Sequence, residues 1–202
     1  PIKDFIPVAR ITDLLENPGG RFDYDGQSYE YPDIKMVWWA GGNPFHHHQD
    51  LNRMRRAWEK PDTIIVNEWC WNSTAIHADI VLPCTTPLER SDIALTPKDP
   101  YQVVIDQVIS PVGDARDDHE IFRGIAAIMG CEDAFTEGRS PQEWQRWIYD
   151  RSRQQASRAG VELPSWEEFQ QDGWVKVPAP ETQTIMMDTF RADPEANPLE
   201  TP

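Results

Sequence analysis

Residues 34–82 read IKMVWWAGGNPFHHHQDLNRMRRAWEKPDTIIVNEWCWNSTAIHADIVL, and this stretch decides the fold. Short, largely apolar runs alternate in it with segments that have helical spacing or helix-stop signals. Runs of this kind are typical of strands buried on both faces. The predicted strands are 34–40, 63–66 and 79–82, and the predicted helices are 49–60 and 73–77. This alternating order predicts an α/β fold with a parallel sheet and right-handed crossovers.

Turn residues and changes in composition predict how the whole chain is organised. Residues 1–30 are expected to be an irregular lead-in, with a short helix near 11–15 and a hairpin turn at Asp25-Gly26. Residues 31–173 are expected to form a Rossmann-like, three-layer α/β domain with helices on both faces of its sheet. Residues 174–202 are expected to be a linker toward a further domain, because their last part, 192–202, is acidic and proline-rich.

The second half of the domain carries clear helix signals. Asp117 is predicted to cap a helix that ends at Gly130, with Ile121, Phe122, Ile125 and Ile128 as its buried stripe. Ser140-Pro141 with Glu143 predicts a capping box for a second helix that runs to about residue 159. A strand at 103–105 and a third helix from Ser165 are also expected.

Composition excludes several classes of function. The formal net charge of −15 disfavours nucleic-acid binding, and no apolar run is long enough to predict membrane insertion. Three cysteines without CxxC spacing argue against a zinc site or a disulfide framework. The chain begins at Pro1 rather than at a methionine, so we expect a fragment or a processed piece.

Polar residues gather in the loops that follow the predicted strands, at 41–49, 67–72 and 83–92. Ligands of open parallel sheets bind at the carboxyl ends of the strands. Gly41-Gly42-Asn43 would let backbone amides approach a phosphate or a pterin edge, or would simply make a tight turn. His46, His47 and His48 resemble a metal site, but adjacent side chains diverge, so hydrogen bonds to a ligand or to neighbouring loops are expected instead.

Four more polar residues are candidates. Asn67 and Glu68 could accept hydrogen bonds from a ribose or a base, or Glu68 could cap its own loop. Arg90 could pair with a phosphate, or form a surface ion pair with Glu89 or Asp92. Asp118 could read a base, or only favour a helix N-terminus.

The motifs GGNPFHHHQDLNR (41–53), HADIVLPCTTPLER (77–90) and ARDDHEIF (115–122) together resemble the dimethyl sulfoxide reductase family of molybdenum enzymes. Within it the chain is most similar to the branch of trimethylamine-N-oxide, dimethyl sulfoxide and biotin sulfoxide reductases. Weaker similarity covers most of the chain, including PEANPLETP at 194–202.

The resemblance implies a parent enzyme of several domains that holds molybdenum through two molybdopterin guanine dinucleotides and reduces S- or N-oxides by oxygen-atom transfer. Residues 31–173 would be part of the domain that binds this cofactor. The implied cofactor contacts are Gly42, Asn43, His46, His47, His48, Gln49, Asn67, Glu68, Arg90 and Asp118. Glu68 departs from the family pattern, which often has Asp there, and Asp118 is the carboxylate expected to read the guanine.

The resemblance also limits what this chain can do. The serine that ligates molybdenum in this branch has no counterpart here, so we expect no catalytic residue, no metal ligand and no activity from the chain alone. Its partners would be the remaining domains and a small S- or N-oxide. Relatives are periplasmic or cytoplasmic, which leaves the localisation open. The alternative is a stand-alone nucleotide-binding or assembly module without catalysis.

Overall fold

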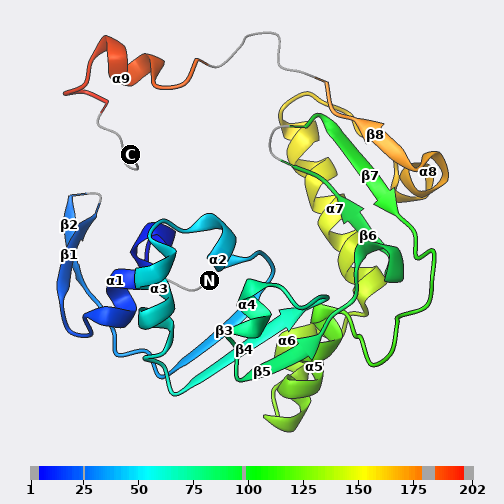
Figure 1. Ribbon diagram of the computed structural model, residues 1–202. Helices are drawn as coiled ribbons and strands as arrows, with labels where there is room; N and C mark the ends of the chain where they lie inside the picture. The colour runs from blue at the N-terminus through cyan, green and yellow to red at the C-terminus, as the bar shows by residue number, and fades with distance from the viewer. Residues whose placement is uncertain (1–4, 25, 97–98, 179–184, 198–202) are drawn as a thin grey trace. The chain divides into compact units, whose positions relative to one another are not determined.

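The computed structural model describes residues 5–24, 26–96, 99–178 and 185–197 (Figure 1). The chain divides into two compact units, Pro1–Leu82 with Thr182–Pro202, and Pro83–Glu181. This division falls inside the domain expected at 31–173. The domain boundaries expected from the sequence stay a prediction.

The first unit is built on a parallel sheet, as the sequence predicted. Strands β3 (Met36–Ala40) and β4 (Thr63–Glu68) pair in parallel, with Met36 opposite Thr63 and Ala40 opposite Asn67. Strand β5 (Ile80–Pro83) completes the order β3-β4-β5. The α/β class is therefore confirmed.

Three helices lie between these strands in the sequence (Figure 1). They are α2 (Pro44–His47), α3 (Leu51–Trp58) and α4 (Ser73–Ile76). The short α2 was expected as loop. It is separated from α3 by residues 48–50, of which Asp50 adopts a left-handed φ of 47° and accepts a hydrogen bond from the Arg53 backbone N–H at 3.1 Å. Helix α3 buries Met54, Ala57 and Trp58 against the sheet residues Ile64 and Val66.

The first thirty residues are regular for much of their length. The expected helix is present as α1 (Ile11–Glu16), preceded by a single 3-10 turn, η1 (Val8–Arg10). Strands β1 (Arg21–Tyr24) and β2 (Gln27–Glu30) pair antiparallel on either side of the expected turn, of which Asp25 lies outside the described residues. Leu14, Leu15 and Phe22 belong to the hydrophobic core, so this lead-in packs as part of the first unit.

The second unit contains an antiparallel sheet that the sequence did not reveal. Its order is β6-β7-β8, with β6 (Asp92–Ala94) following the 3-10 turn η2 (Pro87–Glu89). The strand expected at 103–105 is the central β7 (Tyr101–Ile105), and β8 is Trp174–Lys176. The segment expected to be a linker therefore starts as a strand, and it also contains α9 (Asp188–Ala192). Its last five residues, 198–202, lie outside the described part of the chain.

In its described residues, the second unit also contains the helices α5 (Asp118–Ile128), α6 (Glu132–Thr136), α7 (Pro141–Arg158) and α8 (Trp166–Asp172). The capping box at Ser140 is confirmed, and Asp117 caps α5 by accepting from the Glu120 backbone N–H at 2.8 Å. The expected buried stripe of α5 is present only in part: Ile121, Phe122 and Ile125 are half-buried, Ile128 is 89% exposed, and the buried residue of the helix is Ala126. The best-buried pair is Tyr149 and Phe169, whose rings stack with centroids 4.4 Å apart.

Among the described residues, no helix combines the length and the apolar character needed to cross a membrane.

Candidate functional site

The turn after β3 is built by two glycines and an asparagine. Gly41 and Gly42 have φ of 80° and 73°, a left-handed conformation that glycine adopts without strain. Nothing lies within 4 Å of where a Cβ would stand on either residue. The glycines are therefore required by backbone conformation, and they leave the backbone of the turn open on the surface. The side chain of Asn43 is used within the fold, because its Oδ1 accepts a 2.7 Å hydrogen bond from the hydroxyl of the fully buried Thr74.

At the end of β4, Asn67 and Glu68 have different surroundings. Asn67 is 3% exposed, and its Oδ1 accepts a hydrogen bond from the Trp38 indole N–H at 3.0 Å. Both carboxylate oxygens of Glu68 are held by its own loop: Oε1 accepts from the Trp69 backbone N–H at 3.1 Å, and Oε2 from the Asn72 amide at 2.6 Å. These contacts favour the loop-capping interpretation of Glu68, which the sequence left open.

The loop held by Glu68 leads directly into α4. The Oδ1 of Asn72 caps that helix by accepting hydrogen bonds from the backbone N–H groups of Thr74 and Ala75, both at 3.0 Å. The His77 ring stacks on Phe45 of α2, with centroids 4.4 Å apart. The loops after β3 and β4 are thus joined by two contacts, Asn43–Thr74 and Phe45–His77, and form one edge.

Two of the three consecutive histidines do not diverge as expected, because the His46 and His47 rings meet edge-on with centroids 5.7 Å apart. His46 and His47 are exposed, and His48 is half-buried, where burial and then the neighbouring His47 hold the pKa of its ring below the usual value. The next residue, Gln49, is exposed. Among the residues that the structure describes, no group of three or more His, Cys, Asp or Glu side chains could hold a metal ion.

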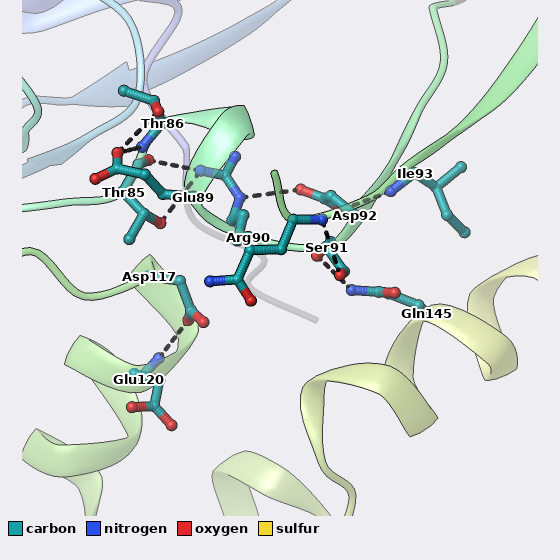
Figure 2. A network of polar contacts seen from close by, with 11 residues as sticks. Thr85, Thr86, Glu89, Arg90, Ser91, Asp92, Ile93, Asp117, Glu120 and Gln145 are labelled. Carbon is teal, nitrogen blue, oxygen red and sulfur yellow. Dashed lines mark hydrogen bonds and ion pairs between the residues drawn. The ribbon is translucent and has the colours of Figure 1, made fainter. Parts of the chain in front are cut away.

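In the second unit, Arg90 is held by the loop around it (Figure 2). Its Nη1 donates to the Thr85 carbonyl at 2.6 Å, and its Nε donates to the Asp92 carboxylate at 3.3 Å. The ion pair that the sequence offered as an alternative is therefore present with Asp92. Glu89 has a different task. It is 6% exposed and accepts hydrogen bonds from the backbone N–H groups of Thr86 and Val112, both at 2.7 Å. These bonds hold the pKa of Glu89 below its usual value.

Arg90 and Asp118 line one cavity of about 250 Å³ within the second unit. The other lining residues are Ser91, Asp92, Asp117, His119, Pro141, Trp144, Gln145 and Ile148. The contribution of α7 could not be predicted from the sequence, because Trp144 and Ile148 have the spacing of an ordinary core-facing stripe. The cavity brings together two of the ten candidate residues. The other eight, from Gly42 to Glu68, lie in the first unit.

One residue that lines this cavity, His119, has ring nitrogens with an unusual environment. Both of its ring nitrogens are screened from solvent, and neither has a hydrogen-bond partner in the described part of the chain. Its ring packs beside Phe135, with centroids 5.3 Å apart. A buried polar group without a hydrogen-bond partner destabilises a fold by about 1–3 kcal/mol, so such groups are rare in folded proteins.

Comparisons with known proteins identify the relatives of this chain. The family model described as Molybdopterin oxidoreductase matches residues 15–128. Biotin sulfoxide reductase of Cereibacter sphaeroides is 46% identical over the whole chain, which covers 27% of that protein. Dimethyl sulfoxide/trimethylamine N-oxide reductase of Rhodobacter capsulatus is 44% identical over 98% of the chain and 24% of its own length. Trimethylamine-N-oxide reductase of Haemophilus influenzae is 40% identical over 99% of the chain and 25% of its own length.

The chain thus spans about a quarter of the length of the curated relatives it matches. Among solved structures, acetylene hydratase from Pelobacter acetylenicus aligns with 86% of this chain and 21% of its own, at a TM-score of 0.60 and 20% identity. That likeness concerns the fold alone.

Proposed function

Because this chain belongs to the molybdopterin oxidoreductase family, we propose that it is a segment of a molybdenum-dependent S- or N-oxide reductase. Its task is to bind the nucleotide end of one molybdopterin guanine dinucleotide. The relatives named for reduction of biotin sulfoxide, dimethyl sulfoxide and trimethylamine N-oxide support the reaction class. In this proposal, the molybdenum cofactor supplies the oxygen-atom transfer chemistry, and this chain supplies binding and orientation.

The observation that carries the proposal is the cavity of the second unit. It combines a carboxylate (Asp118), a guanidinium (Arg90) and an aromatic ring (Trp144). A carboxylate accepts hydrogen bonds from a guanine edge, a guanidinium pairs with oxygen acceptors, and an aromatic ring offers a surface for stacking a base. The unmet hydrogen-bonding demand of His119 in the same wall agrees with a site that a polar ligand or further chain completes.

The edge of the first unit supports a second group of cofactor contacts. The open backbone at Gly42 suits an approaching phosphate or pterin, and His46, His47 and Gln49 are exposed beside it. Asn43, Asn67 and Glu68 already have partners within the fold, so we assign them to shaping the edge as well as to touching the cofactor. His48, which is half-buried, belongs to the same loop.

The activity requires the rest of the polypeptide in this proposal. The chain spans about a quarter of its relatives, and the serine that the resemblance implies as molybdenum ligand has no counterpart in it. We therefore expect the isolated chain to be inactive, with the remaining domains as its partners and a small S- or N-oxide as the substrate of the whole.

Nucleotide analysis of the full-length protein that contains this chain tests the proposal. Acid treatment of the purified protein should release GMP, at two per molybdenum. Asp118→Asn should lower the amount of GMP released per protein, because it replaces one acceptor oxygen with a donor and weakens retention of the cofactor. Asp133→Asn, an exposed carboxylate on α6, is the matched control and should leave the GMP released per protein unchanged. Release of a different nucleotide, or an unchanged amount of GMP per protein in Asp118→Asn, would contradict the proposal.

A further inference from the structure

Helix α7 contributes a wall to the cavity that no sequence motif marks. Trp144, Gln145 and Ile148 line the cavity from this helix, together with Pro141 at its start. The remaining lining residues come from the segments 90–92 and 117–119. The wall therefore joins an aromatic ring and an amide to the carboxylate and guanidinium on the other segments.

The amide of Gln145 has a fixed orientation. Its Nε2 donates to the backbone carbonyl of Ser91 at 2.7 Å (Figure 2). A carbonyl oxygen only accepts, so the nitrogen must face Ser91 and the amide cannot be turned over. What Gln145 can offer to a ligand is consequently its Oε1, an acceptor.

Arg90 is constrained in a similar way. Its Nη1 and Nε are engaged by Thr85 and Asp92, so the group it can offer to the cavity is Nη2, a donor. Asp118 adds a carboxylate to the same lining. The polar groups around the cavity thus include two acceptors and a donor from three different segments. A guanine edge has the complementary set, with donors at N1 and at the 2-amino group and an acceptor at O6.

Trp144 is held in place by its neighbours on the same side of the unit. The Arg139 guanidinium lies over its ring at 4.6 Å from the centroid, and the Trp147 ring meets it edge-on at 5.1 Å. Arg139 is itself paired with Glu137. A ring fixed in this way loses little conformational entropy when a planar ligand packs against it.

We propose that Gln145 and Trp144 are specificity-determining residues of the nucleotide site. Gln145 Oε1 accepts a hydrogen bond from the 2-amino group of guanine, and Trp144 provides the surface on which the base packs. This assignment rests on the proposed function. It adds that α7 makes the site selective for a base with a 2-amino group.

The experiment compares GDP with IDP, which lacks only the 2-amino group. Dissociation constants are measured by calorimetry on the full-length protein purified without its cofactor. Wild type should bind GDP more tightly than IDP, by roughly three- to tenfold for one hydrogen bond. Gln145→Met, nearly equal in size, should lower the affinity for GDP to that for IDP and leave the affinity for IDP almost unchanged. Trp144→Leu should weaken both ligands alike, on the order of tenfold or more for a lost stacking contact.

Two controls separate recognition from folding. Gln155→Met makes the same substitution at an exposed residue of α7 and should leave both affinities unchanged. A loss of IDP binding in Gln145→Met equal to its loss of GDP binding would assign Gln145 to holding Ser91 and would overturn its role in selectivity. Full GDP affinity in Trp144→Leu would overturn the stacking role. In both cases GDP binding by the wild type would leave the proposed function standing. If wild type preferred neither GDP nor IDP over ADP, the proposed function itself would fail.

Discussion

Removing the Asn43–Thr74 hydrogen bond should lower the free energy of unfolding, and the loss should depend on which of the two residues is replaced. The Thr74 hydroxyl donates to Asn43 Oδ1 at 2.7 Å, and it joins the turn after β3 to helix α4. Thr74 is 0% exposed, whereas Asn43 is half-buried. In Thr74→Val the orphaned Asn43 oxygen can turn to water, so we expect a loss of about 1 kcal/mol in the free energy of unfolding.

Asn43→Ala is expected to be the more damaging change. It leaves the Thr74 hydroxyl buried without this acceptor, and an unpaired buried hydroxyl pays its full desolvation cost, about 2 kcal/mol. The double variant should be less destabilised than the sum of the two single variants, with a coupling of about 1 kcal/mol. Thr189→Val, an exposed threonine in α9, is the control and should stay within about 0.5 kcal/mol of wild type.

Urea unfolding of the four variants and the wild type, followed by circular dichroism, measures these differences. Additive single effects would show that the two loops are not coupled through this bond. A larger loss in Thr74→Val than in Asn43→Ala would refute the argument from burial. The result matters for the site, because this bond fixes the edge to which the glycine turn and the histidines belong.

Two further predictions concern the second unit. The pKa of Glu89 is held below its usual value by hydrogen bonds from Thr86 and Val112, so its ionised form stabilises the fold above pH ~4.5 and this stabilisation is lost as pH falls further. Glu89→Gln should therefore flatten the dependence of unfolding free energy on pH below that point, as acid titrations monitored by circular dichroism would show; an unchanged slope would contradict the assignment. Phe169 is 0% exposed and stacks on Tyr149, so Phe169→Ala should cost about 3–5 kcal/mol in urea unfolding, and a loss below about 1 kcal/mol would mean that this pair is not the core of the unit.

The elements of the first unit could be predicted because their signals are local. The apolar runs at β3, β4 and β5 are properties of adjacent residues, and so is Pro61, which directly follows the helix predicted at 49–60. The parallel order followed from the alternation of strands and helices. The helix α2 was not predicted because its four residues are too few to show a helical period, and Pro44 at its first position is its one local signal.

The second unit was harder because its sheet is non-local. Strands β7 and β8 pair Tyr101 with Lys176 across more than seventy intervening residues, and each strand is too short to show a clear period. The cavity is also formed by residues that are distant in the sequence. Arg90 and Asp118 could be picked from motifs, but nothing in the sequence places Gln145 against the Ser91 carbonyl. Contacts of this kind depend on the path of the chain, which local patterns do not record.

The surface of the chain bears on the choice between a segment of a larger enzyme and a stand-alone module. Trp69 and Trp71 are 65% and 75% exposed on a loop in which Glu68 accepts hydrogen bonds from the Trp69 backbone and the Asn72 amide. Ile128 and Met129 are 89% and 74% exposed at the end of α5. Single exposed apolar residues are ordinary, but neighbouring large ones are typical of surfaces that another part of a protein covers. In a stand-alone module, polar residues at these positions would improve solubility. In a segment with further domains packed on it, the apolar side chains would be covered. The exposed pairs therefore favour the segment, and they mark where its remaining domains are expected to pack.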